Sequence, residues 1–530
     1  MRYIIRLLLV AVVFILPATS AQAERVLRLN EVAVGELDPH KALDYIDSIL
    51  LVNIYDPLVR PKPGGGFLPG LAESWEVSSD NLAITFKLQA GIHFHDGSTV
   101  NADDVVYSFD RNKALGMGYA FLFANSSIAK KSDMEVVLTL NNPDSTILAG
   151  LTRLGIVNSD LVKANHQDGD FGDNGDYGSA FLSAQGAGSG AYKVDSHNMQ
   201  ELTVLSKFDD HYGGFLPKSP DTIRVIYVME TATIRTLMSN KEHEITAQWH
   251  PGTMFAGLAA EDGLGLTTED GIAYLVMPIH SAKAPTDDVH VRRAMIAATD
   301  YAQMVAIEKV TEDLTAANRS RTALPAALAG YDASAPEFTQ DLEAAKAHLA
   351  KSKYADNIGD YEVEIAWIAE VPKEEKIAFL LAHNLSQIGM KAKVVKVPWA
   401  VYSDRVTQLE TTPHVGQLYF SATYPDPLSL LGAYHSRVRG SYTSHDWMSD
   451  AEVDRLIDAA TAEMDEAKKN DLLVQLQRRL IDVGAAIYAY ETRALFAKQD
   501  YVKAPFLDDP TNTVAMMGGN WRFNTWEVDN

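Results

Sequence analysis

Apolar and polar residues follow two regular patterns along this chain, and each pattern predicts a different kind of element. Residues 82–89 alternate between large apolar side chains and smaller or polar ones, which predicts a strand with one buried face. Asn101 then stands where a helix N-cap is favoured, and Asp103 and Asp104 bring negative charge to the first turn. We therefore predict a strand followed by a helix, with a turn at residues 96–97 between them.

The same two patterns recur to the end of the chain, without an internal repeat or a long low-complexity segment. Period-two alternation indicates strands, and apolar residues three or four apart indicate helices. Strands are predicted at residues 26–30, 133–140, 244–248, 272–276, 391–397 and 487–490, and helices at residues 44–56, 145–151, 373–388 and from residue 287 onward.

The first 23 residues have the pattern of a cleavable secretory signal. Arg2 and Arg6 precede an apolar run at residues 7–16, and the segment ends in the small-residue sequence at 21–23. An uncleaved anchor is the alternative. No later segment approaches the ~18 consecutive apolar residues that a membrane-spanning helix needs. We expect an exported chain that begins near Glu24 and has no further membrane insertion.

Composition narrows the classes of partner. The 530 residues suffice for two to four domains of ordinary size. Acidic residues number 70 and basic residues 46, for a net charge of −24, and a surface that negative repels nucleic-acid phosphates and anionic headgroups. The absence of cysteine excludes disulfides, thiolate metal sites and a lipid-modified N-terminal cysteine. We expect no nucleic-acid partner.

Catalytic motifs are missing from the sequence. It contains no G-x-S-x-G elbow and no H-E-x-x-H pair. His93 and His95 can be interpreted as a metal pair on one strand face, or as structural histidines near the surface, and we favour the second interpretation. We expect neither an enzyme nor a bound cofactor. The alternative is an exported hydrolase that uses Asp426 with a nearby histidine.

Four segments in a fixed order carry a family resemblance. They are Leu-Ala-Glu-Ser-Trp at 71–75, Thr-Phe-Lys-Leu at 85–88, Gly-Ile-His-Phe-His-Asp-Gly at 91–97 and Ala-Asp-Asp-Val-Val-Tyr-Ser-Phe at 102–109. The run closely resembles the signature of family 5 extracytoplasmic solute-binding proteins, the dipeptide, oligopeptide and nickel receptors of ABC importers. The resemblance implies an α/β fold of the periplasmic binding protein type II class. That fold has two lobes joined by hinge strands, with an extra subdomain in the first lobe.

The resemblance also implies a division of the chain. The first lobe is expected at residues 24–271 and includes an inserted subdomain at about 58–180. The second lobe is expected at residues 272–487, and residues 488–530 return to the first. The two chain crossings would form the hinge.

A function follows from this family assignment. Such a protein captures a small solute of the peptide, opine or peptide-like class between its lobes and delivers it to inner-membrane ABC permease subunits. It would act in the periplasm as a monomer. A nickel- or metal-chelate-binding receptor of the same family is an alternative, and so is a folding helper or signalling receptor that shares the fold.

The segment at residues 419–427 resembles the cleft segment of the second lobe, which makes Tyr419, Thr423, Tyr424 and Asp426 candidate contacts. In peptide-binding members, an aspartate at the position of Thr423 pairs with the ligand's α-ammonium. A buried ammonium without a partner costs several kcal/mol. Either Asp426 or another carboxylate takes that role, or the ligand is not an ordinary peptide with a free N-terminus. We slightly favour the second hypothesis.

Charged residues give further candidate contacts. His435 lies near the place of a metal-ligating histidine in nickel-type relatives, and His445 competes for that place. Both can instead be plain loop histidines. Arg437, Arg111 and Arg153 are candidates to hold a ligand carboxylate in the bidentate manner of a guanidinium.

Aromatic residues complete the candidate site. Tyr45 lies on a helix that faces the cleft in the family, and Trp249 and His250 lie where family members border the cleft. Trp399 begins a segment that resembles the W-x-x-Y-x-x-R-like element of the family. Aromatic side chains offer large rigid surfaces with one polar atom, although each can equally belong to the core. The glycine-rich segment 186–194 resembles a family loop whose backbone approaches the cleft.

Overall fold

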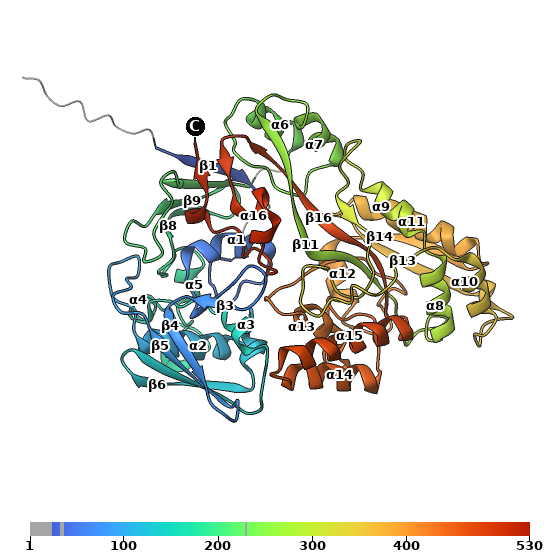
Figure 1. Ribbon diagram of the computed structural model, residues 1–530, viewed down its shortest axis with the longest axis horizontal. Coiled ribbons are helices and arrows are strands. Elements are labelled where there is room, and N and C mark those ends of the chain that lie inside the picture. The colour runs from blue at the N-terminus through green and yellow to red at the C-terminus, as the bar shows by residue number, and fades with distance from the viewer. Residues whose placement is uncertain (1–23, 32–35, 228–229, 530) are drawn as a thin grey trace, which may run out of the picture.

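The computed structural model describes residues 24–31, 36–227 and 230–529. The predicted signal at residues 1–23 lies outside these residues. Two α/β bodies lie side by side and are connected by a long pair of strands (Figure 1). We call the described residues up to Asp270, together with those from Arg493 onward, the first lobe, and residues 274–491 the second lobe.

The first lobe contains a four-stranded sheet of order β1-β10-β9-β8. Its strands are β1 (Val26–Asn30), β8 (Tyr192–Asn198), β9 (Leu202–Lys207) and β10 (Thr222–Ile226). β1 pairs with β10 in parallel, and the other pairs are antiparallel. The predicted strand at 26–30 is confirmed, and so is the helix after it, α1 (Tyr45–Ile54).

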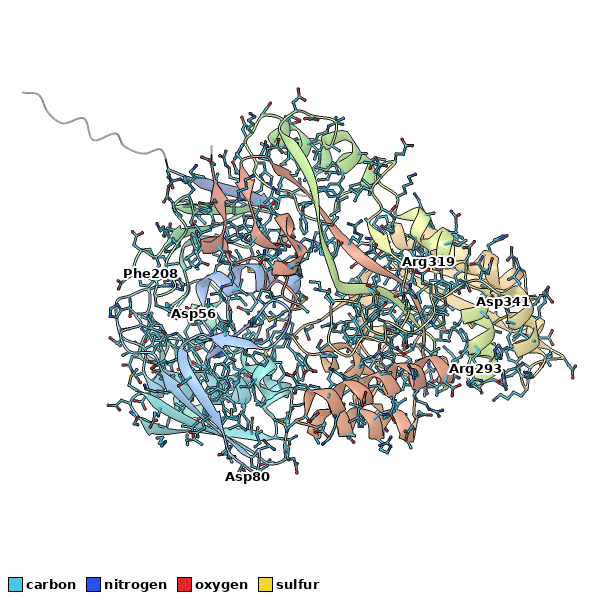
Figure 2. The ribbon with its side chains drawn as sticks, viewed as in Figure 1. Asp56, Asp80, Phe208, Arg293, Arg319 and Asp341 are labelled. Atoms are coloured by element: carbon cyan, nitrogen blue, oxygen red, sulfur yellow. The ribbon has the colours of Figure 1, made fainter. Side chains whose placement is uncertain are left out.

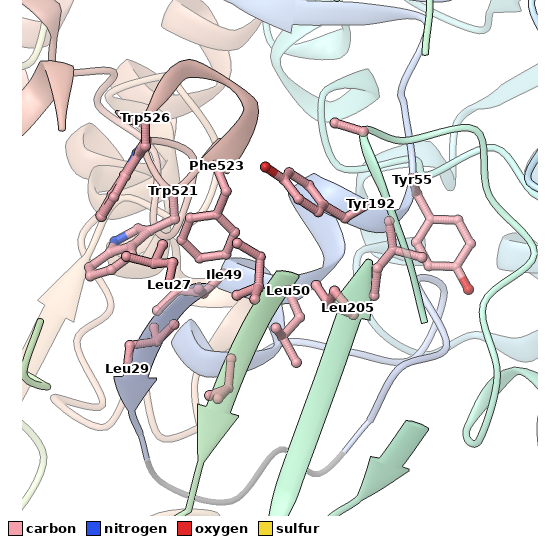
Figure 3. Close-up of a cluster of buried hydrophobic side chains, with 14 of the residues drawn as sticks. Leu27, Leu29, Ile49, Leu50, Tyr55, Tyr192, Leu205, Trp521, Phe523 and Trp526 are labelled. Carbon is pink, nitrogen blue, oxygen red and sulfur yellow. The ribbon is translucent and has the colours of Figure 1, made fainter. Parts of the chain in front are cut away.

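A core of aromatic and aliphatic side chains joins this sheet to α1 and to the C-terminal segment. Leu27 and Leu29 of β1 and Leu50 of α1 pack against Trp521 and Trp526 near the C-terminus (Figure 3). All five side chains are buried. Burying apolar area of this kind contributes about 25 cal/mol per Å². The C-terminal segment is thereby fixed to the first lobe.

The inserted subdomain is built on an antiparallel sheet of order β4-β5-β7-β6. Its strands are β4 (Ala72–Val77), β5 (Ala83–Leu88), β6 (Ser126–Ser132) and β7 (Glu135–Leu140). The predicted strands at 82–89 and 133–140 are confirmed as β5 and β7. A short hairpin of β2 (Val59–Pro61) and β3 (Phe67–Pro69) leads into this sheet.

The predicted N-cap of the next helix is confirmed. The Asn101 side chain accepts a hydrogen bond from the backbone N–H of Asp103, and the Asn101 backbone N–H donates to the Asp104 carboxylate, which forms a capping box at the start of α2 (Ala102–Leu115). The helix ends at Gly116, whose φ of 64° is left-handed. The other helices of this region are α3 (Ile147–Leu151), α4 (Ser159–Ala164) and α5 (Ser179–Leu182).

Two long antiparallel strands, β11 (Leu264–Pro278) and β16 (Ala486–Gln499), connect the lobes. Figure 1 shows them running from beside α6 (Thr231–Ser239) and α7 (Gly252–Leu258) into the second lobe. Their register shifts where Asp270 and Tyr274 face Arg493 and Glu491. The predicted strands at 272–276 and 487–490 are parts of this pair. The predicted lobe boundaries at 271/272 and 487/488 fall inside the same two strands and remain a prediction.

The second lobe surrounds the far ends of these strands. β12 (Ala317–Asn318) and β15 (Leu418–Ser421) flank them, and β13 (Glu362–Ile368) pairs in parallel with β14 (Lys391–Val397). The helices of this lobe are α8 (Val289–Ala298), α9 (Tyr301–Ile307), α10 (Leu342–Leu349), α11 (Lys373–Ser386), α12 (Trp399–Arg405), α13 (Leu428–Leu431), α14 (Ala451–Ala462) and α15 (Glu466–Val483). The predicted helices from residue 287 and at 373–388 are confirmed as α8 and α11. The chain closes on the first lobe with α16 (Pro505–Asp508) and the pair β17 (Val502–Lys503) and β18 (Glu527–Val528).

Two local predictions are wrong in detail. Residues 244–248 do not form a strand, because Ile245 alone makes isolated bridges, to Leu29 and Lys498. The glycine-rich segment 186–194 is packed against the end of α1. A side chain at Gly188 would overlap the carbonyl oxygen of Ile54. The glycines therefore allow the backbone of this segment to approach the end of α1, and not the ligand cleft as the sequence predicts.

Among the described residues, none of the helices combines the length and apolar character needed to cross a bilayer.

Candidate ligand-binding site

A cavity of about 840 Å³ lies between the lobes, and we call it the interlobe cavity. Its first-lobe wall includes Tyr119, Phe121 and Asp144, and its second-lobe wall includes Phe420 of β15 and Tyr442. The volume is within the ~300–1,000 Å³ typical of small-molecule sites. A ligand held here would contact both lobes at once.

Arg153 forms hydrogen bonds to both lobes. Its Nη1 donates to Ser48 Oγ at 3.2 Å and its Nη2 to the Met517 carbonyl at 2.6 Å, both within the first lobe. Its Nε donates to the carbonyl oxygen of Thr423 in the second lobe. The guanidinium also lies 5.1 Å from the centre of the Tyr119 ring. Burial lowers the pKa of Arg153. One first-lobe cation is therefore hydrogen-bonded to the segment that resembles the family cleft.

A second pair of contacts closes the lobes beside the cavity. The backbone N–H of Ser145 donates to the Thr461 carbonyl at 2.8 Å, and its Oγ donates to the Ala460 carbonyl at 3.1 Å. On the other side, the N–H of Met517 donates to the Ala422 carbonyl at 2.7 Å. The two lobes are therefore in direct contact on both sides of the cavity.

Within the segment 419–427, the structure separates the candidates. Thr423 and Tyr424 line the interlobe cavity. Asp426 does not line it, because its carboxylate accepts from Lys469 Nζ at 2.5 Å and from the Leu428 backbone at 2.9 Å, at the start of α13. Burial raises the pKa of Asp426, and Lys469 lowers it. Asp426 is thus occupied by structural partners, and no histidine is among them, which leaves the hydrolase hypothesis without support here.

Arg437 and His435 form an ionic cluster at the second-lobe wall. Arg437 lines the cavity and donates to Asp458 Oδ1 at 3.0 Å. His435 Nδ1 accepts from the Arg437 backbone N–H at 3.1 Å, and its Nε2 lies 3.4 Å from Asp458. His435 is buried behind the wall. Among the described residues, no group of three or more His, Asp or Glu side chains is arranged to hold a metal ion.

Comparison with known proteins decides the family. The sequence profile described as "Bacterial extracellular solute-binding proteins, family 5 Middle" matches residues 66–441. This chain belongs to that family. The resemblance that its motifs predict is confirmed, and the chain is a solute-binding receptor.

Individual relatives agree with this assignment. The probable D,D-dipeptide-binding periplasmic protein DdpA of Escherichia coli (strain K12) is 26% identical over 495 residues, which cover 91% of this chain and 92% of that protein. Heme-binding protein A of Haemophilus influenzae is 25% identical and covers 80% of this chain and 79% of its own.

A solved structure supports the predicted fold class. The ABC transporter-associated periplasmic binding protein DppA from Helicobacter pylori, in complex with peptide STSA, superposes with a TM-score of 0.77. It is 21% identical and covers 95% of this chain and 98% of that one. The fold is the type II periplasmic binding protein fold.

In this solute-binding protein, the aromatic candidates fall into separate groups. Tyr45 and Trp249 meet edge to face at 6.0 Å between ring centres, and Trp249 Nε1 donates to Glu31 at 3.2 Å. His250 is buried and accepts from Asn30 Nδ2 at 3.0 Å, and burial lowers its pKa. These three residues belong to the first lobe and do not line the interlobe cavity.

Trp399 and Tyr419 stand behind the second-lobe wall. The Trp399 ring, 38% exposed, meets the ring of Tyr442 at 5.6 Å, one side chain away from the cavity. Tyr419 precedes Phe420, which lines the cavity, and alternate residues of a strand point to opposite faces. The Tyr419 hydroxyl is 2.7 Å from that of Tyr490, and Lys373 lies 4.3 Å from its ring centre.

Arg111 and the histidines of the signature serve the first lobe itself. Arg111 is fully buried, donates to both oxygens of Asp38 and lies 2.8 Å from His40 Nδ1. We therefore leave Arg111 out of the candidate site. His93 pairs with Asp210 at 2.6 Å, and His95 with the Gly190 carbonyl at 2.9 Å, so the two histidines have different partners.

The sequence interpretation missed much of the cavity wall. Tyr119, Phe121, Phe420 and Tyr442 line it and were not among the candidate contacts. Phe121 is 61% exposed, which is unusual for a phenylalanine. For Phe420, strand alternation within 419–427 offered a signal, because it excludes Tyr419 and Phe420 from the same face.

Proposed function

We propose that this chain captures a small solute of the peptide, opine or peptide-like class in the periplasm and delivers it, chemically unchanged, to the permease subunits of an inner-membrane ABC importer. One observation carries the proposal: the interlobe cavity has walls from both lobes, so a ligand there contacts two bodies that meet through hinge strands. The E. coli relative is named as a periplasmic protein.

The proposed mechanism is enclosure. A ligand that binds both walls favours the closed arrangement by its differential affinity for the two states, and the strands β11 and β16 absorb the movement. Arg153 supplies part of the closed contact, because it already bridges Ser48 and Thr423. The permease would recognise the closed, monomeric form.

The proposed ligand lacks an ordinary free N-terminus bound at position 423. Thr423 brings no carboxylate to the cavity wall, and Asp426 is held by Lys469. An α-ammonium beside Thr423 would find no free carboxylate in the segment 419–427, and of the carboxylates in the wall, Asp144 accepts from Thr146 and Asp458 from Arg437. Burying an ammonium without a charged partner costs several kcal/mol. The two relatives are named for a D,D-dipeptide and for heme, so the family alone does not choose the ligand.

Mass spectrometry of the compound released from protein purified from periplasm tests this proposal. We expect one intact small molecule that rebinds the stripped protein, and loss of its uptake when the gene is deleted. Conversion of that molecule to a product by the pure protein would establish an enzyme instead. Normal uptake after deletion would contradict the transport role and leave the binding role standing.

A further inference from the structure

The first lobe contains a second cavity, of about 380 Å³, and we call it the first-lobe cavity. Its walls come from α1, from the β2–β3 hairpin and from the C-terminal segment 505–525. Tyr119 lines this cavity and the interlobe cavity alike, and Arg153 lines this cavity and donates to the carbonyl oxygen of Thr423, which lines the interlobe cavity. No residue of the second lobe is among the described residues that line it.

Positive charge distinguishes this cavity from the rest of the molecule. Arg60, Arg153 and Arg522 line it, and none of the described lining residues is Asp or Glu. The chain as a whole has 70 acidic and 46 basic residues. A cavity with arginines and no carboxylate in its wall is therefore a local reversal of the charge of the protein.

Arg60 and Arg522 have few partners of their own. Arg522 Nη2 forms an ion pair with Asp56 Oδ1 at 3.5 Å, which is longer than an ordinary hydrogen bond. Asp56, which Figure 2 places inside the first lobe, is also 3.5 Å from His211 and accepts from Ser189 at 3.2 Å. Arg60 Nε donates to the Pro69 carbonyl at 2.9 Å, and within the described residues no carboxylate forms an ion pair with Arg60.

The two guanidinium groups also disfavour each other. Burial lowers the pKa of Arg522, the charge of Arg60 lowers it further, and Asp56 raises it. A bound anion would relieve this repulsion and satisfy N–H groups in the bidentate geometry that guanidinium groups offer.

Much of the remaining wall of the cavity is apolar. Leu51 and Val52 of α1 face Phe506, Val514 and Met516 of the C-terminal segment across it. The volume lies at the lower end of the ~300–1,000 Å³ found for small-molecule sites. The wall thus suits a compact apolar body joined to one anionic group.

We propose that the first-lobe cavity is a second binding site, which takes a small organic anion with an apolar body, such as a monocarboxylate, and that Arg60 and Arg522 bind its carboxylate. This site is distinct from the interlobe cavity, where the transported solute is proposed to bind. Arg153 lines the first-lobe cavity and is hydrogen-bonded to Thr423 in the wall of the interlobe cavity.

Titration calorimetry of the stripped, full-length protein with octanoate tests the proposal. We expect one octanoate per chain, a Kd raised at least tenfold by Arg60→Gln, and a Kd within twofold of wild type for Arg455→Gln. Arg455 is the matched control because it pairs with Glu452 on the exposed face of α14. 1-Octanol, which has the same chain and no charge, should bind at least tenfold more weakly.

Further variants keep the proposal falsifiable if Arg60→Gln fails to fold. Val52→Phe fills the cavity from α1 without changing charge and should also weaken octanoate binding at least tenfold. Arg437→Gln, in the interlobe wall, should leave the Kd within twofold, as should saturation with the copurified solute. Equal binding of octanol and octanoate, loss of binding in Arg437→Gln, or competition with that solute would overturn the proposal.

Discussion

At position 423, a threonine stands in the cavity wall where the peptide-binding members that this chain resembles have an aspartate. Its carbonyl oxygen accepts from Arg153, so that oxygen already has a donor. No other residue of the segment 419–427 compensates, because Asp426 is paired with Lys469. The segment 419–427 therefore offers no free carboxylate to a ligand ammonium.

Thr423→Asp should create affinity for peptides with a free N-terminus. A hydrogen bond to a charged group contributes about 1.5–3 kcal/mol, so we expect Ala-Phe to bind at least tenfold more tightly than to wild type. N-acetyl-Ala-Phe, which has no ammonium, should bind no better. Thr423→Asn is the uncharged control, and calorimetry measures all four cases. Submicromolar binding of Ala-Phe to the wild type would refute our ligand assignment.

Arg153→Ala should weaken binding of the copurified solute at least tenfold. The substitution removes the hydrogen bond to the second lobe and leaves the Thr423 and Met517 carbonyls without this donor. Arg455→Ala, on the exposed face of α14, is the control. A Kd within twofold of the wild type, measured by calorimetry, would show that the hydrogen bond from Arg153 to Thr423 does not favour the closed arrangement.

The arginines show what sequence reasoning can reach in the site. Arg111, Arg153 and Arg437 are equal candidates from sequence; the structure places Arg437 in the cavity wall, bonds Arg153 to the Thr423 carbonyl of that wall, and buries Arg111 in the first lobe. Arg111 pairs with Asp38, 73 positions earlier in the chain. No local pattern identifies such a partner. The sequence therefore predicts which residues can bind an anion, but not which groups in the folded protein they bind.

Local patterns predicted elements well where one face is buried and a cap is present. Residues 82–89 and the cap at Asn101 were predicted closely, because alternation and capping are properties of neighbouring residues. Residues 244–248 alternate too, but only Ile245 finds bridge partners, at Leu29 and Lys498. Strand pairing depends on segments far apart in the chain, and the alternation of neighbouring residues gives no information about them.

Gly188→Ala should destabilise the first lobe. Its new methyl group would overlap the Ile54 carbonyl oxygen at the end of α1, and forced overpacking costs about 1–3 kcal/mol of the free energy of unfolding. Gly252→Ala is the matched control, because the nearest neighbour of its new methyl group, on Val310, would be 3.7 Å away. Urea unfolding compares the two. Equal stability of both variants would contradict the packing account.

Glu269 of the connecting strand β11 predicts a pH dependence. Burial raises its pKa from 4.5 to about 7, while its hydrogen bond from Asn520 lowers it. Because the folded-state pKa is the higher one, the stabilising contribution is complete below pH ~4.5 and is lost as the pH rises through about 7.

Urea unfolding of wild type and Glu269→Gln between pH 4.5 and 8 measures this contribution. Relative to the variant, the wild type should lose on the order of 3 kcal/mol across that range. The comparison removes the effect of other buried carboxylates, such as Glu374 and Asp446, which both proteins share. A constant difference across the range would contradict a raised pKa at Glu269.

The molecule as a whole is two bodies with a cavity between them, and this arrangement was predicted by the family resemblance more than by periodicity. The signature residues at 71–109 lie in the inserted subdomain, away from most of the second-lobe wall. The cavity itself depends on contacts such as that of Ser145 with Thr461, more than 300 positions apart. Its lining was therefore beyond local sequence patterns.

Small-angle X-ray scattering of the stripped protein, with and without its copurified solute, tests this account most directly. If the solute bridges the lobes, its addition at saturation should lower the radius of gyration as the two bodies close around it. Identical scattering profiles, in a sample where calorimetry shows one solute bound per chain, would contradict capture between the lobes.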